Sequence, residues 1–176
     1  MSKMSLRTEE GKSRYTQPDL SGLFCYHPES GDIIWLKHQK NNQVKVGSVA
    51  GAKNKSGHIM IGYAGRRWYA HRLAWFLYYG EWPSTHIDHI NGNPLDNRIT
   101  NLRLATQSQN MMNKRKLSSS RGKFKGITWH NRNKKWVAQI KKDGKNTYLG
   151  SFASQEEAHA KYREVAQIKF GEFART

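Results

Sequence analysis

The stretch HIDHINGNPLDNRITNLRLATQSQN, residues 86–110, is rich in His, Asp and Asn. Asp88 and His89 set a hard oxygen ligand beside an imidazole, which suits a divalent cation and water activation. The residues Asn-Gly-Asn-Pro that follow are typical of a bend, and the chain can then return as a short alternating strand and begin a helix. This strand, loop, strand and helix should bring together four side chains: Asp88, His89, Asn101 and Asn110.

The charge of the whole chain points to a nucleic-acid partner. The 176 residues include 30 Lys and Arg against 13 Asp and Glu, a net charge of +17. A field of this sign and size favours nucleic acid first and an anionic membrane second. We find neither a run of about 20 apolar residues nor the apolar core of a signal peptide, so we expect no membrane contact and a cytoplasmic location.

The positive charge is uneven, which predicts two modules. Residues 1–113 carry 14 basic and 8 acidic residues, and residues 114–176 carry 16 and 5. Between the two halves lies NKRKLSSSRGK, a Ser-rich, cationic stretch without hydrophobic periodicity, as expected of a linker. We predict a nuclease-containing part over 15–113, a basic linker over 114–123 and a second module over 124–176.

The first part should begin with β-structure and end its lead-in with a helix. Two hairpins are predicted over 23–36 and 57–73, the second with Ala64-Gly65 at its tip. Residues 70–80 then take helical spacing, with Gly80 as the stop signal. Cys25 is the sole cysteine, so neither an intrachain disulfide nor Cys-rich zinc ligation is available.

The second module is predicted to be three strands and a helix. Alternating stretches cover 124–130, 135–142 and 146–152, with Asp143-Gly144 as a short hairpin connection. The helix is expected over 154–170, where Ser154 and Glu157 have capping-box spacing. Counting by two along the strands separates an apolar face, which would pack on the helix, from a polar and cationic outer face.

The opening stretch resembles the HNH nuclease motif in the form found in phage and intron-encoded homing endonucleases. The resemblance covers roughly residues 68–114 and includes AHRLAWFLYYGEWPS at 70–84. It implies a ββα-metal fold in which His89 is the general base and Asn101 orients its imidazole. Asp88 and Asn110 would be the ligands of one Mg²⁺, with Mn²⁺ able to substitute. Asn110 stands where the family often has histidine, and its amide oxygen suits a hard ion.

Residues 125–174 resemble the DNA-binding domain of the plant APETALA-two and ethylene-response factors. The resemblance rests on WVAQI, YLGSF and EEA followed by Tyr162, and it implies that the outer sheet face meets double-stranded DNA. The residues expected to contact DNA are Lys125, Thr128, His130, Arg132, Lys135, Gln139, Lys141 and Tyr148.

Together these features predict an α+β protein: a ββα-metal nuclease module with a hairpin lead-in, followed by a three-stranded antiparallel sheet packed on one helix. The predicted activity is that of a phage-encoded homing endonuclease in the bacterial host. It would have no small-molecule substrate, and it would nick DNA as a monomer or weak dimer. Three alternatives stay open: a zinc knuckle of His71, His86 and His89, a DNA-binding regulator that does not cut, and an RNA-binding protein.

Overall fold

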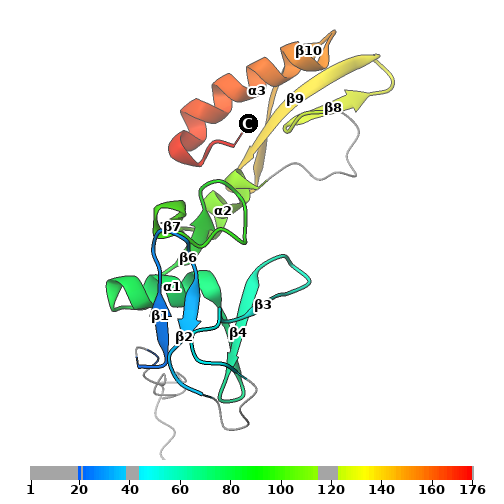
Figure 1. Cartoon of the computed structure of the whole chain (residues 1–176). Coiled ribbons are helices and arrows are strands. Elements are labelled where there is room, and N and C mark those ends of the chain that lie inside the picture. The colour runs from blue at the N-terminus through cyan, green and yellow to red at the C-terminus, as the bar shows by residue number, and fades with distance from the viewer. Residues whose placement is uncertain (1–19, 21, 39–43, 115–122, 176) are drawn as a thin grey trace, which may run out of the picture.

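The computed structural model describes residues 20, 22–38, 44–114 and 123–175 (Figure 1). The interior of the predicted linker falls outside these ranges. Within them, no helix is long and apolar enough to cross a membrane.

The N-terminal part contains the two predicted hairpins and one short strand that was not predicted. Strands β1 (Phe24–Tyr26) and β2 (Ile33–Trp35) pair antiparallel. Strands β4 (Ile59–Tyr63) and β5 (Arg66–Tyr69) form the second hairpin, and β3 (Ala52–Lys53) adds to its edge. Ala64 and Gly65 both take positive φ angles at the tip, as expected for a tight two-residue connection.

Helix α1 (Ala70–Tyr79) follows β5 directly and ends where Gly80 takes a left-handed conformation. Its fully buried Leu73 joins Phe24, Trp35 and Ile61 in one hydrophobic cluster. This cluster ties both hairpins to the helix and also includes Ile87 and Leu102 from the next two strands. The lead-in therefore shares its core with the segment that carries the candidate site.

The predicted strand, loop, strand and helix is present in that order. Strand β6 (His86–His89) pairs antiparallel with β7 (Leu102–Ala105), and a short 3₁₀ turn, η1 (Ile99–Asn101), precedes β7. Helix α2 (Gln107–Asn113) begins with a capping box formed by Thr106 and Gln109.

The C-terminal part matches its prediction closely. Strands β8 (Ile127–His130), β9 (Lys135–Lys142) and β10 (Lys145–Phe152) form an antiparallel sheet with β9 in the centre. Helix α3 (Gln155–Phe170) covers one face, with Ser154 accepting a cap hydrogen bond from the Glu157 amide. A final turn, η2 (Gly171–Phe173), leads the chain back toward α2.

The two parts are joined by packing as well as by the chain. Ala105 and Met112, from β7 and α2, lie in one buried cluster with residues of the C-terminal part, namely Ile140, Tyr162, Ala166, Phe170 and Phe173. Figure 1 shows α2 between the lead-in and the C-terminal sheet. The parts on either side of the predicted linker are thus also joined by a hydrophobic contact, which the sequence analysis did not predict.

Candidate active site

Asp88, His89 and Asn110 line one cavity of about 420 Å³. Asp88 and His89 end β6, and Asn110 lies on α2, which packs against that strand. Both β6 residues are buried, with exposed fractions of 7%. Three of the four residues predicted to converge therefore face a shared space.

The carboxylate of Asp88 is held by two donors. Arg103, its cross-strand partner in β7, donates from Nε and contacts with Nη2, at 2.9 and 2.8 Å from Oδ2. Asn113 Nδ2 lies 3.0 Å from both carboxylate oxygens and 2.7 Å from the carbonyl of His89. Arg103 is also buried in large part, so this ion pair balances the charge of Asp88 inside the fold.

Asp88 and Asn110, the residues predicted to ligate a hard divalent cation, both line this cavity. Asn110 uses its amide nitrogen toward the Ile87 carbonyl, at 3.4 Å, which orients the amide through its donor end. Carboxylate and amide oxygens without thiolate are the ligand types of Mg²⁺ rather than of soft metals. The cavity they line has room for the waters that Mg²⁺ keeps.

His89 is oriented by Asn97, which corrects the contact predicted for Asn101. The Nε2 atom of His89 lies 3.1 Å from Oδ1 of Asn97. Because an amide oxygen only accepts, Nε2 carries the proton of the neutral ring and the lone pair is at Nδ1. Asn97 has an exposed fraction of 2%, although its place in an Asn- and Asp-rich turn had suggested turn chemistry alone.

Asn101 instead holds the turn that follows His89. Its Nδ2 donates to the Asp96 carbonyl at 2.7 Å and to Asn91 Oδ1 at 3.1 Å. Its Oδ1 accepts from the Asn91 amide at 2.9 Å. The prediction placed Asn101 on the imidazole, whereas at the end of η1 its side chain contacts Asn91 and the Asp96 carbonyl within the turn.

The N-terminal hairpin supports Asn97 from behind. The hydroxyl of Tyr26 donates to the Asn97 carbonyl at 2.7 Å, and the Ile99 amide donates to the Pro28 carbonyl at 3.2 Å. At Gly31, whose φ is +82°, an added Cβ would lie 2.6 Å from the Arg98 nitrogen and the Asn97 carbonyl carbon. The β1–β2 turn thus packs directly on the backbone of the residue that orients His89.

His58 and His71 lie next to His89. The ring centroids of His71 and His89 are 5.1 Å apart, and those of His58 and His89 are 5.9 Å apart. Burial, with smaller effects from His89, His58 and Arg72, lowers the pKa of His71 to about 3. Burial also lowers the pKa of His89, and its hydrogen bond to Asn97 opposes that shift. Both rings are uncharged near neutral pH, as a general base requires.

The zinc knuckle considered from the sequence included the wrong third histidine. The described histidines that come together are His58, His71 and His89. His86 is exposed at the opposite end of β6. His58 lies just before β4, and its approach to His71 and His89 depends on the fold rather than on sequence spacing.

The outer face of the C-terminal sheet is open. Seven of the eight residues predicted to meet DNA are exposed, and Tyr148 reaches 63%. Lys125 is the exception, because its ammonium group donates to the Met112 carbonyl of α2. Burial and then the charge of Arg175 lower the pKa of Lys125 to about 8.

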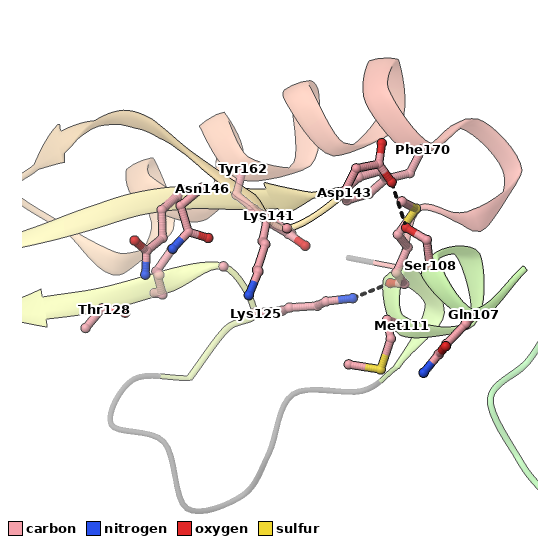
Figure 2. Close-up of a pocket in the computed structure, with 15 residues that line it drawn as sticks. Gln107, Ser108, Met111, Lys125, Thr128, Lys141, Asp143, Asn146, Tyr162 and Phe170 are labelled. Atoms are coloured by element: carbon pink, nitrogen blue, oxygen red, sulfur yellow. Dashed lines mark hydrogen bonds between the residues drawn. The ribbon is translucent and has the colours of Figure 1, made fainter.

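Part of this face lines a second cavity of about 650 Å³, shared with α2. Figure 2 shows Lys125, Thr128 and Lys141 on the sheet side of this space and Ser108 and Met111 on the helix side. A hydrogen bond of 3.1 Å from Ser108 to Asp143 closes one end. The surface predicted to read DNA is therefore continuous with the helix that carries Asn110.

The end of the chain contacts the candidate active site at two places. The guanidinium of Arg103 lies 3.7 Å from the ring centre of Phe173, and Nη1 donates to the Glu172 carbonyl at 2.9 Å. Arg175 donates to the Asn91 carbonyl at 2.8 Å, and its guanidinium occupies the space that a Cβ on Gly92 would need. Both contacts reach residues that hold Asp88 or the turn after His89.

Sequence reasoning missed Asn97, Asn113 and the pairing of Arg103 with Asp88. Asn113 had a usable signal, since it lies three residues after Asn110 and hence on the same side of α2. Arg103 had one too, because antiparallel pairing of His89 with Leu102 places it opposite Asp88. The contact of Asn97 depends on the path of an irregular turn, for which the sequence has no periodicity to follow.

Comparison with known proteins agrees with this geometry. Residues 68–112 match a family described as HNH endonuclease. Protein 3.8 of Escherichia phage T7 is 33% identical over 90 residues, covering 51% of this chain and 74% of that protein. An uncharacterised HNH endonuclease of Acanthamoeba polyphaga mimivirus is 38% identical over 96 residues, covering 54% of this chain and 49% of that protein.

A plant protein matches over a comparable length. The AP2-like ethylene-responsive transcription factor ANT of Arabidopsis thaliana is 36% identical over 107 residues, or 57% of this chain and 19% of that protein. No solved structure matches. The phage relative is matched over most of its length and the family match runs from within β5 into α2, so the chain belongs to the HNH endonuclease family.

Proposed function

We propose that the protein is a site-directed DNA endonuclease of the homing type that nicks one strand as a monomer. The observation that carries the proposal is the shared cavity of Asp88, His89 and Asn110, with His89 fixed by Asn97. This cavity contains one base and one pair of oxygen ligands, a set that can cleave one phosphodiester bond at a time. A break in both strands would then need a second copy or a second event.

In the proposed reaction His89 acts on water. Its Nδ1 lone pair accepts a proton as the water oxygen attacks phosphorus, while Nε2–H keeps donating its hydrogen bond to Asn97 Oδ1 and so holds the ring in one tautomer. Cleavage of the bond between phosphorus and the 3′ oxygen leaves a 3′-hydroxyl and a 5′-phosphate.

Asp88 and Asn110 would hold one Mg²⁺, for which Mn²⁺ can substitute. When bound, this ion supplies charge neutralisation on the scissile phosphate and the leaving oxygen. Arg103 and Asn113 keep the Asp88 carboxylate in place through the bonds described above.

The C-terminal sheet would supply much of the affinity for double-stranded DNA. Its exposed outer face carries Thr128, Gln139 and Lys141, whose side chains can reach base edges in a major groove. Arg132 and Lys135, at the connection between β8 and β9, suit phosphate contacts that position the protein. The partial likeness to the plant factor supports this assignment.

The test is a nicking assay on supercoiled DNA that carries the sequences flanking the gene. The wild-type protein is compared with His89→Ala and with His86→Ala, a histidine exposed on the same strand. We expect nicked circles with Mg²⁺, none with chelator, and a loss of about 100-fold or more for His89→Ala only. The nicks should be sealed by DNA ligase without end repair, as 5′-phosphate and 3′-hydroxyl ends require.

Intact DNA in every lane, with binding retained in a gel shift, would instead identify a DNA-binding regulator that does not cut. Equal loss of activity in the two histidine variants would show that His89 is not the base.

A further inference from the structure

We propose that His58, His71 and His89 form a second metal site, which takes Zn²⁺ or a similar transition ion and inactivates the nuclease by occupying its base. The site is distinct from the oxygen ligands Asp88 and Asn110. The inhibitory consequence rests on the proposed role of His89, whereas binding of the ion does not.

The three imidazoles already converge. One nitrogen from each ring lies within 4.8 Å of the other two, and the ring centroids are 5.1 to 5.9 Å apart. Tetrahedral zinc with Zn–N bonds of about 2.0–2.1 Å holds its nitrogens roughly 3.3–3.4 Å apart. Ring movements of about 1 Å would close the set, and His58 lies partly exposed just before β4.

Hydrogen bonds already direct two of the rings. His89 uses Nε2 on Asn97, and His58 has Nδ1 3.2 Å from the Ser56 hydroxyl. The opposite nitrogen of each ring is then left for a ligand. Metal-bound histidines commonly hold their second nitrogen in this way, which fixes the tautomer and the ring plane.

His71 adds an observation that packing does not explain. Its Nδ1 is one of two buried side-chain nitrogen or oxygen atoms in the described ranges that have no hydrogen-bond partner. Leaving a buried polar atom unpaired costs about 1–3 kcal/mol. An ion bound through this nitrogen would satisfy it.

The chemistry of the set selects against Mg²⁺. Three neutral nitrogen donors without a carboxylate suit Zn²⁺, Co²⁺, Ni²⁺ and Cu²⁺, whereas Mg²⁺ requires oxygen. His58 and His89 both line the 420 Å³ cavity, so an ion can enter from it and keep an open fourth position there. The two sites would then respond to different metals while sharing one cavity.

Binding is tested first, without DNA. The full chain, cleared of metal, is titrated with Co²⁺ while the visible d–d absorption is followed, and Zn²⁺ is then added to displace it. His58→Gln and His71→Gln are compared with His86→Gln, and circular dichroism checks that each variant is folded. We expect a tetrahedral spectrum saturating at one ion per chain, with affinity reduced at least about tenfold in the first two variants and unchanged in the third.

Inhibition is tested second, as the nicking rate without Zn²⁺ divided by the rate with Zn²⁺, at saturating Mg²⁺ for each protein. A large ratio for the wild type and His86→Gln, falling toward one for His58→Gln, is the expected result. No saturable Co²⁺ spectrum, or equal affinity in all three variants, would overturn the site. A normal Co²⁺ spectrum in a protein that never nicks DNA would overturn the proposed function and leave the metal site standing.

Discussion

At the scale of single residues, Asn97 and Asn101 hold different parts of the candidate active site. Asn97 contacts the imidazole of His89, and Asn101 contacts the backbone of the turn between Asn91 and Asp96. Substituting Asn97 should therefore affect the His89 ring, whereas substituting Asn101 should affect the turn.

The first prediction concerns the acid limb of the pH profile, the pH range in which activity falls on acidification. A base works unprotonated, so kcat/KM falls as the pH drops through the pKa of His89. Burial lowers that pKa from its ordinary 6.5, so the limb should lie below pH 6.5. Asn97→Asp places a negative charge beside the His89 ring and raises the pKa of His89. The acid limb should therefore move up by roughly one pH unit or more. Asn97→Ala removes a bond that raises the pKa and should move it down.

The measurement is kcat/KM for nicking against pH at fixed Mg²⁺. A limb that stays in place in both variants would show that Asn97 does not influence the base.

The second prediction concerns Asn101→Ala. This side chain is buried and makes three hydrogen bonds within the turn. Removing it leaves partly buried backbone groups of the turn without this partner and should lower the free energy of unfolding by about 1–3 kcal/mol. The pH of the acid limb should not change, since Asn101 does not touch the ring. Urea denaturation and the pH profile together check this, and a shifted limb would return Asn101 to the role first predicted for it.

At the scale of elements, the β1–β2 hairpin supports the turn that carries Asn97. Gly31 packs against the backbone of Asn97 and Arg98, and Tyr26 holds the Asn97 carbonyl. A hairpin more than 50 residues away in sequence thus helps to set the ring of His89.

The third prediction compares Gly31→Ala with Gly47→Ala. Both glycines have φ near +82°, but a Cβ at Gly47 would meet nothing within 4 Å. Gly47→Ala should cost only the left-handed backbone strain, about 1–2 kcal/mol. Gly31→Ala adds a steric overlap of about 1–3 kcal/mol, and relief of that overlap should displace Asn97 and lower kcat. Equal kcat in the two variants would contradict a link between the hairpin and the base.

Individual elements also show what could be predicted from the sequence. The C-terminal strands alternate clearly and Asp143-Gly144 carries the conformation of a tight hairpin, so β8, β9 and β10 could be placed within a few residues. Thr106 and Gln109 likewise mark the start of α2. Asp88, His89 and Asn110 could be placed together because they lie in regular elements. Asn97 and His58 could not, since irregular turns carry them to the site.

At the scale of the whole molecule, the predicted two modules have a common hydrophobic cluster and a common set of polar contacts. Phe173 lies in that cluster and against Arg103, which in turn holds Asp88. Apart from Lys125, which contacts the Met112 carbonyl, the side chains predicted to meet DNA are exposed and lie outside that cluster.

The fourth prediction distinguishes the role of the shared cluster from that of the outer sheet face. Phe173→Ala should lower the free energy of unfolding by about 3–5 kcal/mol and slow nicking, because Arg103 loses its support. Lys141→Ala should leave stability unchanged, weaken DNA binding and reduce by about one the slope of log affinity against log salt. Thermal melts, nicking rates and salt-dependent gel shifts distinguish the two outcomes. Loss of stability in Lys141→Ala would show that this face is structural.

The contact of Ala105 and Met112 with the C-terminal cluster also matters for engineering. A nuclease and a reader joined by a tether alone can be recombined freely. Here a replacement reader would leave Met112 exposed, and Arg103 and Asn91 without their partners from the chain end. A chimera built on this nuclease should therefore retain α3 and η2 and graft new specificity onto the outer face of β8, β9 and β10.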